Sequence, residues 1–144
     1  MRLTSGADEM RFIDANIVVD GLIDQNTETH ISSALLLERI QAGAEQVAMT
    51  GPALAEVVFI LRTARAGRKS AAEIASILTS FLAASSLELE NRIVWIRTLE
   101  LMAIHNVDLP DAHMAALLEG EPVAEVYSLD TDFDRIPGIT RLET

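Results

Sequence analysis

Apolar residues follow two alternating patterns along this chain, and each pattern predicts one kind of element. Short continuous apolar runs are typical of strands buried in a parallel sheet. Such runs predict strands at residues 11–14, 46–49, 87–90, 125–129 and 140–142. Apolar residues at helical spacing predict helices at residues 16–23, 28–42, 50–66, 70–82, 91–106 and 111–118. Because strands alternate with helices, we expect a three-layer α/β/α sandwich with a mostly parallel central sheet.

Local signals predict where several of these helices begin and end. Residues 50–52 read Thr-Gly-Pro, which is typical of a helix cap followed by a proline in the first turn. Ser70 and Glu73 have the spacing of a capping box, and Gly67 before them predicts a helix stop. The second helix is expected to turn four apolar residues toward the core: Ile31, Leu35, Leu36 and Ile40.

The length and composition predict a single globular domain. A chain of 144 residues is long enough to bury a sizeable core. We therefore predict one domain over residues 1–144, with residues 1–10 as a flexible N-terminal lead. Apolar residues make up 49% and charged residues 23%, a balance typical of globular rather than disordered proteins. Because the chain has no cysteine, disulfides, thiolate metal sites and a cysteine nucleophile are excluded.

Nothing in the sequence predicts a membrane segment. No apolar run approaches the ~20 residues that a membrane-spanning helix needs. Residues 1–10 include Asp8 and Glu9 and have no hydrophobic block, so we expect no secretory signal there. We predict a cytoplasmic protein that does not bind a membrane.

The formal net charge of -11 narrows the choice of partners. It argues against general binding to nucleic-acid phosphates, which needs lysine and arginine. It does not exclude a nuclease, because a bound metal neutralises an acidic site before the substrate arrives. The charge is explained either by a basic partner or by solubility alone.

Aspartates follow two of the predicted strands. Asp14 follows the first strand, and Asp130, Asp132 and Asp134 follow the strand at residues 125–129. Open α/β sheets place their sites at the carboxyl ends of strands, so Asp14 and Asp130 meet if their strands are neighbours in one sheet. The alternative is a polar turn that closes each strand, because aspartate is a common turn residue.

Two further carboxylates, Glu56 and Asp111, lie on predicted helices. Glu56 lies near the margin of an apolar helix face, and Asp111 lies in a first turn, where the helix dipole favours negative charge. Taken singly, each has an ordinary explanation as a flanking or N-terminal helix residue. Together with Asp14 and Asp130 they form a set of hard oxygen donors that suits Mg²⁺ or Mn²⁺. The chemistry that fits such a set is metal-assisted hydrolysis of a phosphodiester.

Four segments resemble those of a known family. They read FIDAN at residues 12–16, TGPALAE at 50–56, VDLPDA at 107–112 and YSLDTDFDRIPG at 127–138. With these segments the chain resembles a PIN domain, most closely the VapC-like toxin ribonucleases of bacterial type II toxin–antitoxin pairs. The resemblance covers nearly the whole chain, from about Arg11 to Glu143.

This resemblance implies a Mg²⁺- or Mn²⁺-dependent endoribonuclease that acts as the toxin of a VapBC-type pair. By matching position it implies four catalytic metal ligands: Asp14, Glu56, Asp111 and Asp130. It also implies Asp132 as a further metal ligand, and Asn16 and Ser128 as residues that orient the carboxylates. It implies a homodimer and a cognate antitoxin protein, an arginine of which would reach the acidic pocket.

Four basic residues gather at one predicted helix end and turn: Arg62, Arg65, Arg68 and Lys69. They are candidates for contact with the RNA backbone beside the acidic site. The alternative is a solvated helix end whose cations complement the helix dipole.

Other functions stay open. A PIN nuclease that processes RNA in housekeeping would share this site, and a small upstream gene for a DNA-binding protein would favour the toxin instead. A catalytically silent PIN-like binding module is the rival from another class, although the intact carboxylates argue against it. A haloacid-dehalogenase-like phosphatase is disfavoured because Asn16 stands where it needs a second aspartate. That enzyme and a phospho-receiver domain both need a late lysine, and Lys69 is the only lysine.

Overall fold

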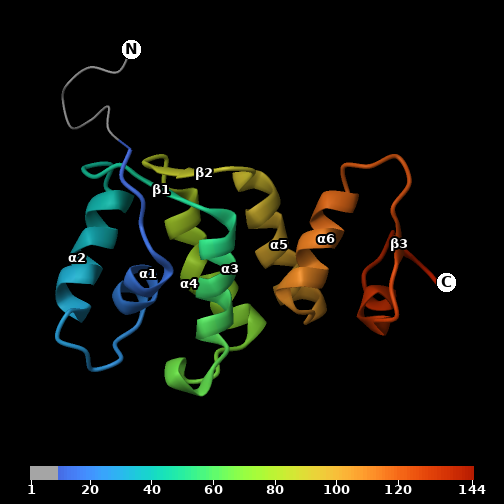
Figure 1. The fold of residues 1–144 in the computed structure, drawn as a ribbon, viewed down its shortest axis with the longest axis horizontal. Coiled ribbons are helices and arrows are strands. Elements are labelled where there is room, and N and C mark those ends of the chain that lie inside the picture. Colours follow the sequence, from blue (N-terminus) through green and yellow to red (C-terminus); the bar gives the residue numbers. More distant parts are fainter. Residues whose placement is uncertain (1–9) are drawn as a thin grey trace, which may run out of the picture. The chain divides into compact units, whose positions relative to one another are not determined.

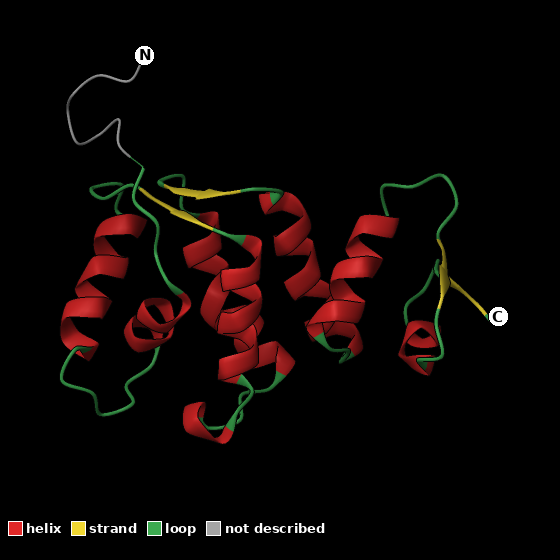
Figure 2. Ribbon diagram, viewed as in Figure 1, coloured by secondary structure: helices red, strands yellow, loops and turns green. Residues whose placement is uncertain are grey.

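The computed structural model describes residues 10–144 (Figures 1 and 2). These residues form two compact units. Unit 1 consists of residues 10–69 and 77–90, and unit 2 consists of residues 70–76 and 91–144. The predicted N-terminal lead lies outside the described residues except for Met10. The single domain stays a prediction. Within residues 10–144, no helix combines the length and the apolar character needed to cross a bilayer.

Unit 1 contains the first part of the alternating pattern. Its elements are α1 (Ala15–Leu22), α2 (His30–Gln41), β1 (Val47–Met49), α3 (Gly51–Leu61), η2 (Ala64–Ala66), the C-terminal part of α4 (Ala71–Ala83) and β2 (Leu87–Leu89). Strands β1 and β2 pair in parallel, with Val47 opposite Leu87. The predicted first strand is wrong in extent, because it is reduced to one parallel bridge between Phe12 and Ala48. It stops there because α1 begins at Ala15, with Asp14 in the N-cap position.

Helices α1 and α2 pack against each other at Gly21. A Cβ atom there would lie 2.7 Å from Leu37 Cδ1 and 2.8 Å from the carbonyl oxygen of Ser33, so only glycine permits this approach. Helix α3 begins as predicted, because the Thr50 hydroxyl accepts a hydrogen bond from the amide of Ala53. It ends at Leu61 rather than near residue 66, and the short 3₁₀ helix η2 follows it.

A buried carboxylate, Asp20, determines which face of α2 packs inward. Only 7% of Asp20 is exposed, and it accepts hydrogen bonds from the hydroxyls of Thr27, Thr29 and Ser33. These bonds, that of Thr27 first, lower the pKa of Asp20 below its usual value. The prediction that Ile31 and Leu35 face the core is wrong, since they are 72% and 49% exposed. Helix α2 instead turns Ser33 toward Asp20, and the hydroxyls of Thr27 and Thr29 reach Asp20 from the segment before the helix.

Unit 2 contains the second part of the pattern. Its elements are the N-terminal part of α4, α5 (Arg92–His105), α6 (Leu109–Leu118), β3 (Glu125–Tyr127), η3 (Thr131–Arg135) and β4 (Thr140–Leu142). Strands β3 and β4 pair in parallel, with Glu125 opposite Thr140. Ser70 and Glu73 form the predicted capping box. Because all strand pairing among residues 10–144 is parallel and alternates with helices, the predicted α/β class is confirmed.

Helices α5 and α6 form the main packed pair of unit 2. The Trp95 and His113 rings stack with their centroids 4.0 Å apart, and the Thr98 hydroxyl lies 3.2 Å from His113 Nδ1. Two hydrogen bonds of 2.8 and 2.9 Å join the guanidinium of Arg97 to the carboxylate of Glu119. These contacts fix the position of α6, whose first turn carries Asp111.

Candidate metal centre

The segment after β3 is shaped by hydrogen bonds between side chains and nearby backbone amides. The Ser128 hydroxyl accepts a hydrogen bond of 2.9 Å from the amide of Asp130. Asp130 Oδ1 in turn accepts a hydrogen bond of 2.9 Å from the amide of Asp132, which makes Asp130 the cap of η3. Each is a local turn that a short polar side chain forms with its own backbone. The two turns place the Asp130 and Asp132 side chains on consecutive parts of one bend.

Asp111 comes from a different element. Asp108 stands at the N-cap position of α6, and Pro110 and Asp111 lie in the first turn. The free amides and the dipole at a helix N-terminus favour a carboxylate at this place. Because α6 contacts η3, the first turn of α6 brings Asp111 beside the bend after β3.

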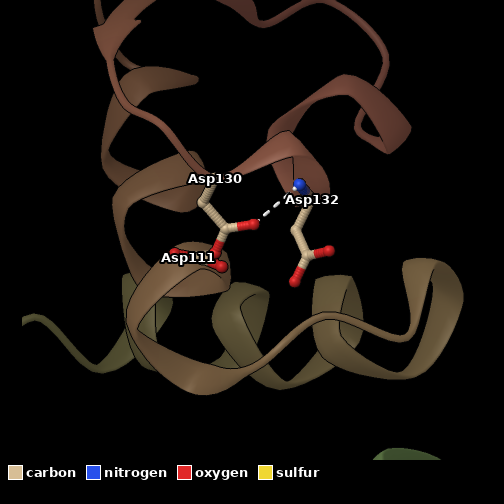
Figure 3. Close-up of side chains that lie close together, drawn as sticks. All are labelled: Asp111, Asp130 and Asp132. Carbon is tan, nitrogen blue, oxygen red and sulfur yellow. Dashed lines mark hydrogen bonds between the residues drawn. The ribbon is translucent and has the colours of Figure 1, made fainter.

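The three aspartates form a cluster, here termed the acidic triad: Asp111, Asp130 and Asp132 (Figure 3). One carboxylate oxygen from each lies within 4.8 Å of the others. Asp111 and Asp132 are half-buried, and Asp130 is exposed. Burial first, and then the hydrogen bond and charge of Asp130, raise the pKa of Asp111 to about 6. A proton therefore binds at this site near pH 6.

The donor set of the triad fits a hard divalent cation. It offers carboxylate oxygens only, which are the ligands that Mg²⁺ and Mn²⁺ prefer. Carboxylates at this separation repel one another unless a proton or a cation lies among them. The pKa of Asp111 is raised by burial first and then by this repulsion.

Two arginines lie beside the triad. Arg135 Nη2 lies 2.8 Å from Asp132 Oδ1 and also donates a hydrogen bond of 3.2 Å to the carbonyl of Asn106. Arg141, on β4, pairs with Asp134 through Nε at 3.1 Å and donates to the Ser128 carbonyl. Arg135 is not among the site residues that the sequence predicts. The only indication in the sequence is that Arg135 lies three residues after Asp132. Residues at this spacing contact each other in a 3₁₀ helix such as η3.

The remaining carboxylates of the predicted set, Asp14 and Glu56, belong to unit 1. Asp14 is the exposed N-cap residue of α1, and its side chain makes no capping hydrogen bond. Glu56 is exposed on α3. The structure thus brings together three of the five predicted ligands, and the place of Asp14 and Glu56 in the site stays a prediction.

One of the predicted basic residues, Arg65, contacts the start of α1 in unit 1. Arg65 Nη2 donates a hydrogen bond of 3.2 Å to Asn16 Oδ1, at the start of α1. The backbone carbonyl of Arg65 accepts a hydrogen bond from Gln25. Arg65 is therefore held by Asn16, which lies two residues after Asp14, and the part of Asn16 in orienting the carboxylates stays a prediction.

Comparison with known proteins identifies the family. The family model described as PIN domain matches residues 11–139. No curated protein matches the chain at a significant level. PIN domains are usually nucleases, and PIN nucleases generally use divalent metal ions. Because the matched region includes most of the sequence and residues of both units, this chain belongs to the PIN domain family.

Proposed function

We propose that this PIN domain is a Mg²⁺- or Mn²⁺-dependent endoribonuclease that hydrolyses RNA phosphodiester bonds. The observation that carries the proposal is the acidic triad, in which two separate elements bring three carboxylates within 4.8 Å. Such a cluster is costly unless it binds a cation, and this family uses divalent cations in catalysis.

The proposed ligands are the carboxylates that the sequence predicts. Asp111 and Asp130 would hold the ion, with Asp132 beside them, and Asp14 and Glu56 complete the predicted set. Bound there, a divalent ion supplies Lewis-acid stabilisation of phosphoryl charge and lowers the pKa of a coordinated water. The carboxylates themselves orient the reacting groups, and a hydroxyl at Ser128 keeps the backbone of Asp130 in place.

A basic segment offers a second contribution to substrate binding. It is formed by Arg62, Arg65, Arg68 and Lys69. In a chain with a net charge of -11, such a cluster is where an RNA backbone would gain favourable phosphate contacts. Arg65 donates a hydrogen bond to Asn16, which favours one position of its guanidinium before RNA arrives.

We further propose that the chain is the toxin of a VapBC-type pair, that it acts in the cytoplasm as a homodimer and that it binds a cognate antitoxin. The segments that resemble VapC-like toxins support this role, and the acidic charge suits a partner that presents an arginine. A housekeeping RNA-processing nuclease would use the same site. A small gene for a DNA-binding protein directly upstream separates the toxin from that alternative.

The test is cleavage of labelled RNA by purified protein without antitoxin. We expect cutting with Mg²⁺ or Mn²⁺, no cutting with excess chelator, and loss of cutting in the Asp14→Asn and Asp111→Asn variants. Glu38→Gln is the matched control, because it removes one exposed carboxylate from α2 and should leave cleavage unchanged. Absence of both cleavage and Mn²⁺ binding would refute the enzyme and favour a silent PIN-like binding module.

A further inference from the structure

Arg135 is bound to both segments that carry the acidic triad. Its Nη2 lies 2.8 Å from Asp132 Oδ1, three residues earlier on η3. Residues three apart in a 3₁₀ helix lie directly above one another, so η3 itself holds the guanidinium beside this carboxylate. The same nitrogen donates to the carbonyl of Asn106, which ends α5 and leads to α6. Arg135 therefore joins the bend after β3 to the connection that precedes Asp111.

This contact changes the charge that the triad offers to a cation. Three ionised carboxylates carry three negative charges, and the guanidinium of Arg135 offsets one of them at Asp132. The neighbouring pair Arg141 and Asp134 offset each other. Two negative charges then remain in the ionised triad, on Asp111 and Asp130.

We propose that Arg135 is the internal counter-ion of the acidic triad, which takes Asp132 out of the ligand set and lowers the affinity for divalent cations. This inference rests on the proposed metal-dependent function and deepens it, because it assigns different roles to adjacent carboxylates. Asp111 and Asp130 bind the ion, while Asp132 is committed to Arg135. Arg135 touches neither the ion nor the substrate and acts only through Asp132 and through its charge.

The proposal predicts opposite effects for the two members of the ion pair. Arg135→Gln removes a positive charge next to the cation and leaves Asp132 available, so Mn²⁺ should bind about tenfold tighter. Asp132→Asn leaves an unmatched guanidinium near the site, so Mn²⁺ should bind about tenfold more weakly. The double variant removes the ion pair as a unit, and its affinity should return to within about threefold of the wild-type value.

The measurement is calorimetric titration of Mn²⁺ into the full chain at fixed pH and ionic strength. Arg135→Lys keeps the charge and should bind Mn²⁺ as the wild type does. Arg39→Gln is the matched control, because Arg39 forms an ion pair with Glu45 in unit 1 and is 52% exposed, against 51% for Arg135. It lowers the net charge equally and should leave the affinity unchanged. Thermal unfolding of each variant verifies that it is folded.

Three outcomes would overturn the proposal. The first is an Arg135→Gln variant that binds Mn²⁺ no more tightly than the wild type. The second is a double variant that stays as weak as Asp132→Asn, which would make Asp132 a direct ligand. The third is an Arg135→Lys variant that behaves like Arg135→Gln. If no variant binds Mn²⁺, the metal-dependent function falls as well, whereas wild-type binding with any of these three outcomes refutes the counter-ion alone.

Discussion

Lowering the pH should weaken Mn²⁺ binding, because a proton competes for the acidic triad. The pKa of Asp111 is raised from 3.8 to about 6 by burial first and then by Asp130. A metal ligand must be deprotonated, so each ion that binds near this pH displaces the proton. An ordinary exposed aspartate would already be ionised at that pH and would show no such competition.

The magnitude follows from the fraction of Asp111 that is ionised. With a pKa of about 6, roughly nine tenths of the group is ionised at about pH 7 and roughly one tenth at about pH 5. The apparent affinity should therefore fall about tenfold between these two pH values. With a pKa of 3.8, the loss over the same range would be under about 10%.

The assay is calorimetric titration of Mn²⁺ at about pH 5, 6 and 7, in two buffers with different ionisation enthalpies at each pH. The difference between buffers measures the protons released, and we expect about half a proton per ion at about pH 6. Thermal unfolding at each pH controls for loss of folded protein. An affinity that is equal at the two extremes, or no proton release near pH 6, would refute the reasoning.

The raised pKa of Asp111 also makes the stability of the metal-free protein depend on pH. Because the folded-state pKa of Asp111 is raised, its contribution is fully present below 3.8 and is lost as the pH rises through about 6. After discounting for the solvent exposure of the site, this contribution is about 1 kcal/mol.

Two further predictions concern unit 1. Gly21→Ala should destabilise the protein by about 1–3 kcal/mol in denaturant unfolding, because its Cβ would lie 2.7 Å from Leu37 Cδ1. Gly120→Ala is its control, since a Cβ there meets nothing closer than 3.6 Å; equal effects would contradict the close approach. Asp20→Ala should lower the midpoint of thermal unfolding more than Asp24→Ala does, because it leaves three hydroxyl groups without their acceptor. The pKa of Asp20 is lowered, so this difference should be present above pH 3.8 and shrink as the pH falls further; a constant difference would contradict its origin in the carboxylate.

Features that depend on neighbouring residues could be predicted from the sequence. The cap at Thr50 and the box of Ser70 and Glu73 are formed by groups three residues apart, so their spacing is enough. The inward face of α2 could not be predicted, because Ser33 is buried by a carboxylate on another helix. The spacing of apolar residues gives no information about a polar partner on another helix.

The candidate site likewise has parts that the local sequence predicts and parts that it does not. Asp130 and its turns follow from the local sequence, and Asp111 was a candidate because carboxylates suit a first helical turn. The contact between Asp111 and Asp130 depends on the packing of α6 against η3, which no local pattern contains. Arg135 was missed because three aspartates at alternate positions after a strand predict a turn, whereas the structure has a 3₁₀ helix there.

The parallel pairing of β3 with β4 has a consequence for the permitted length of the chain between them. Parallel strands cannot be joined by a tight turn and need a connection of about a dozen residues. Here that connection is residues 128–139, and it carries η3 with Asp130, Asp132 and Arg135. Because this connection is already near the minimum length, a deletion would leave it too short to join the two strands. Substitutions on its exposed side are compatible with the fold, but shortening it would separate the strands and remove the acidic bend at the same time.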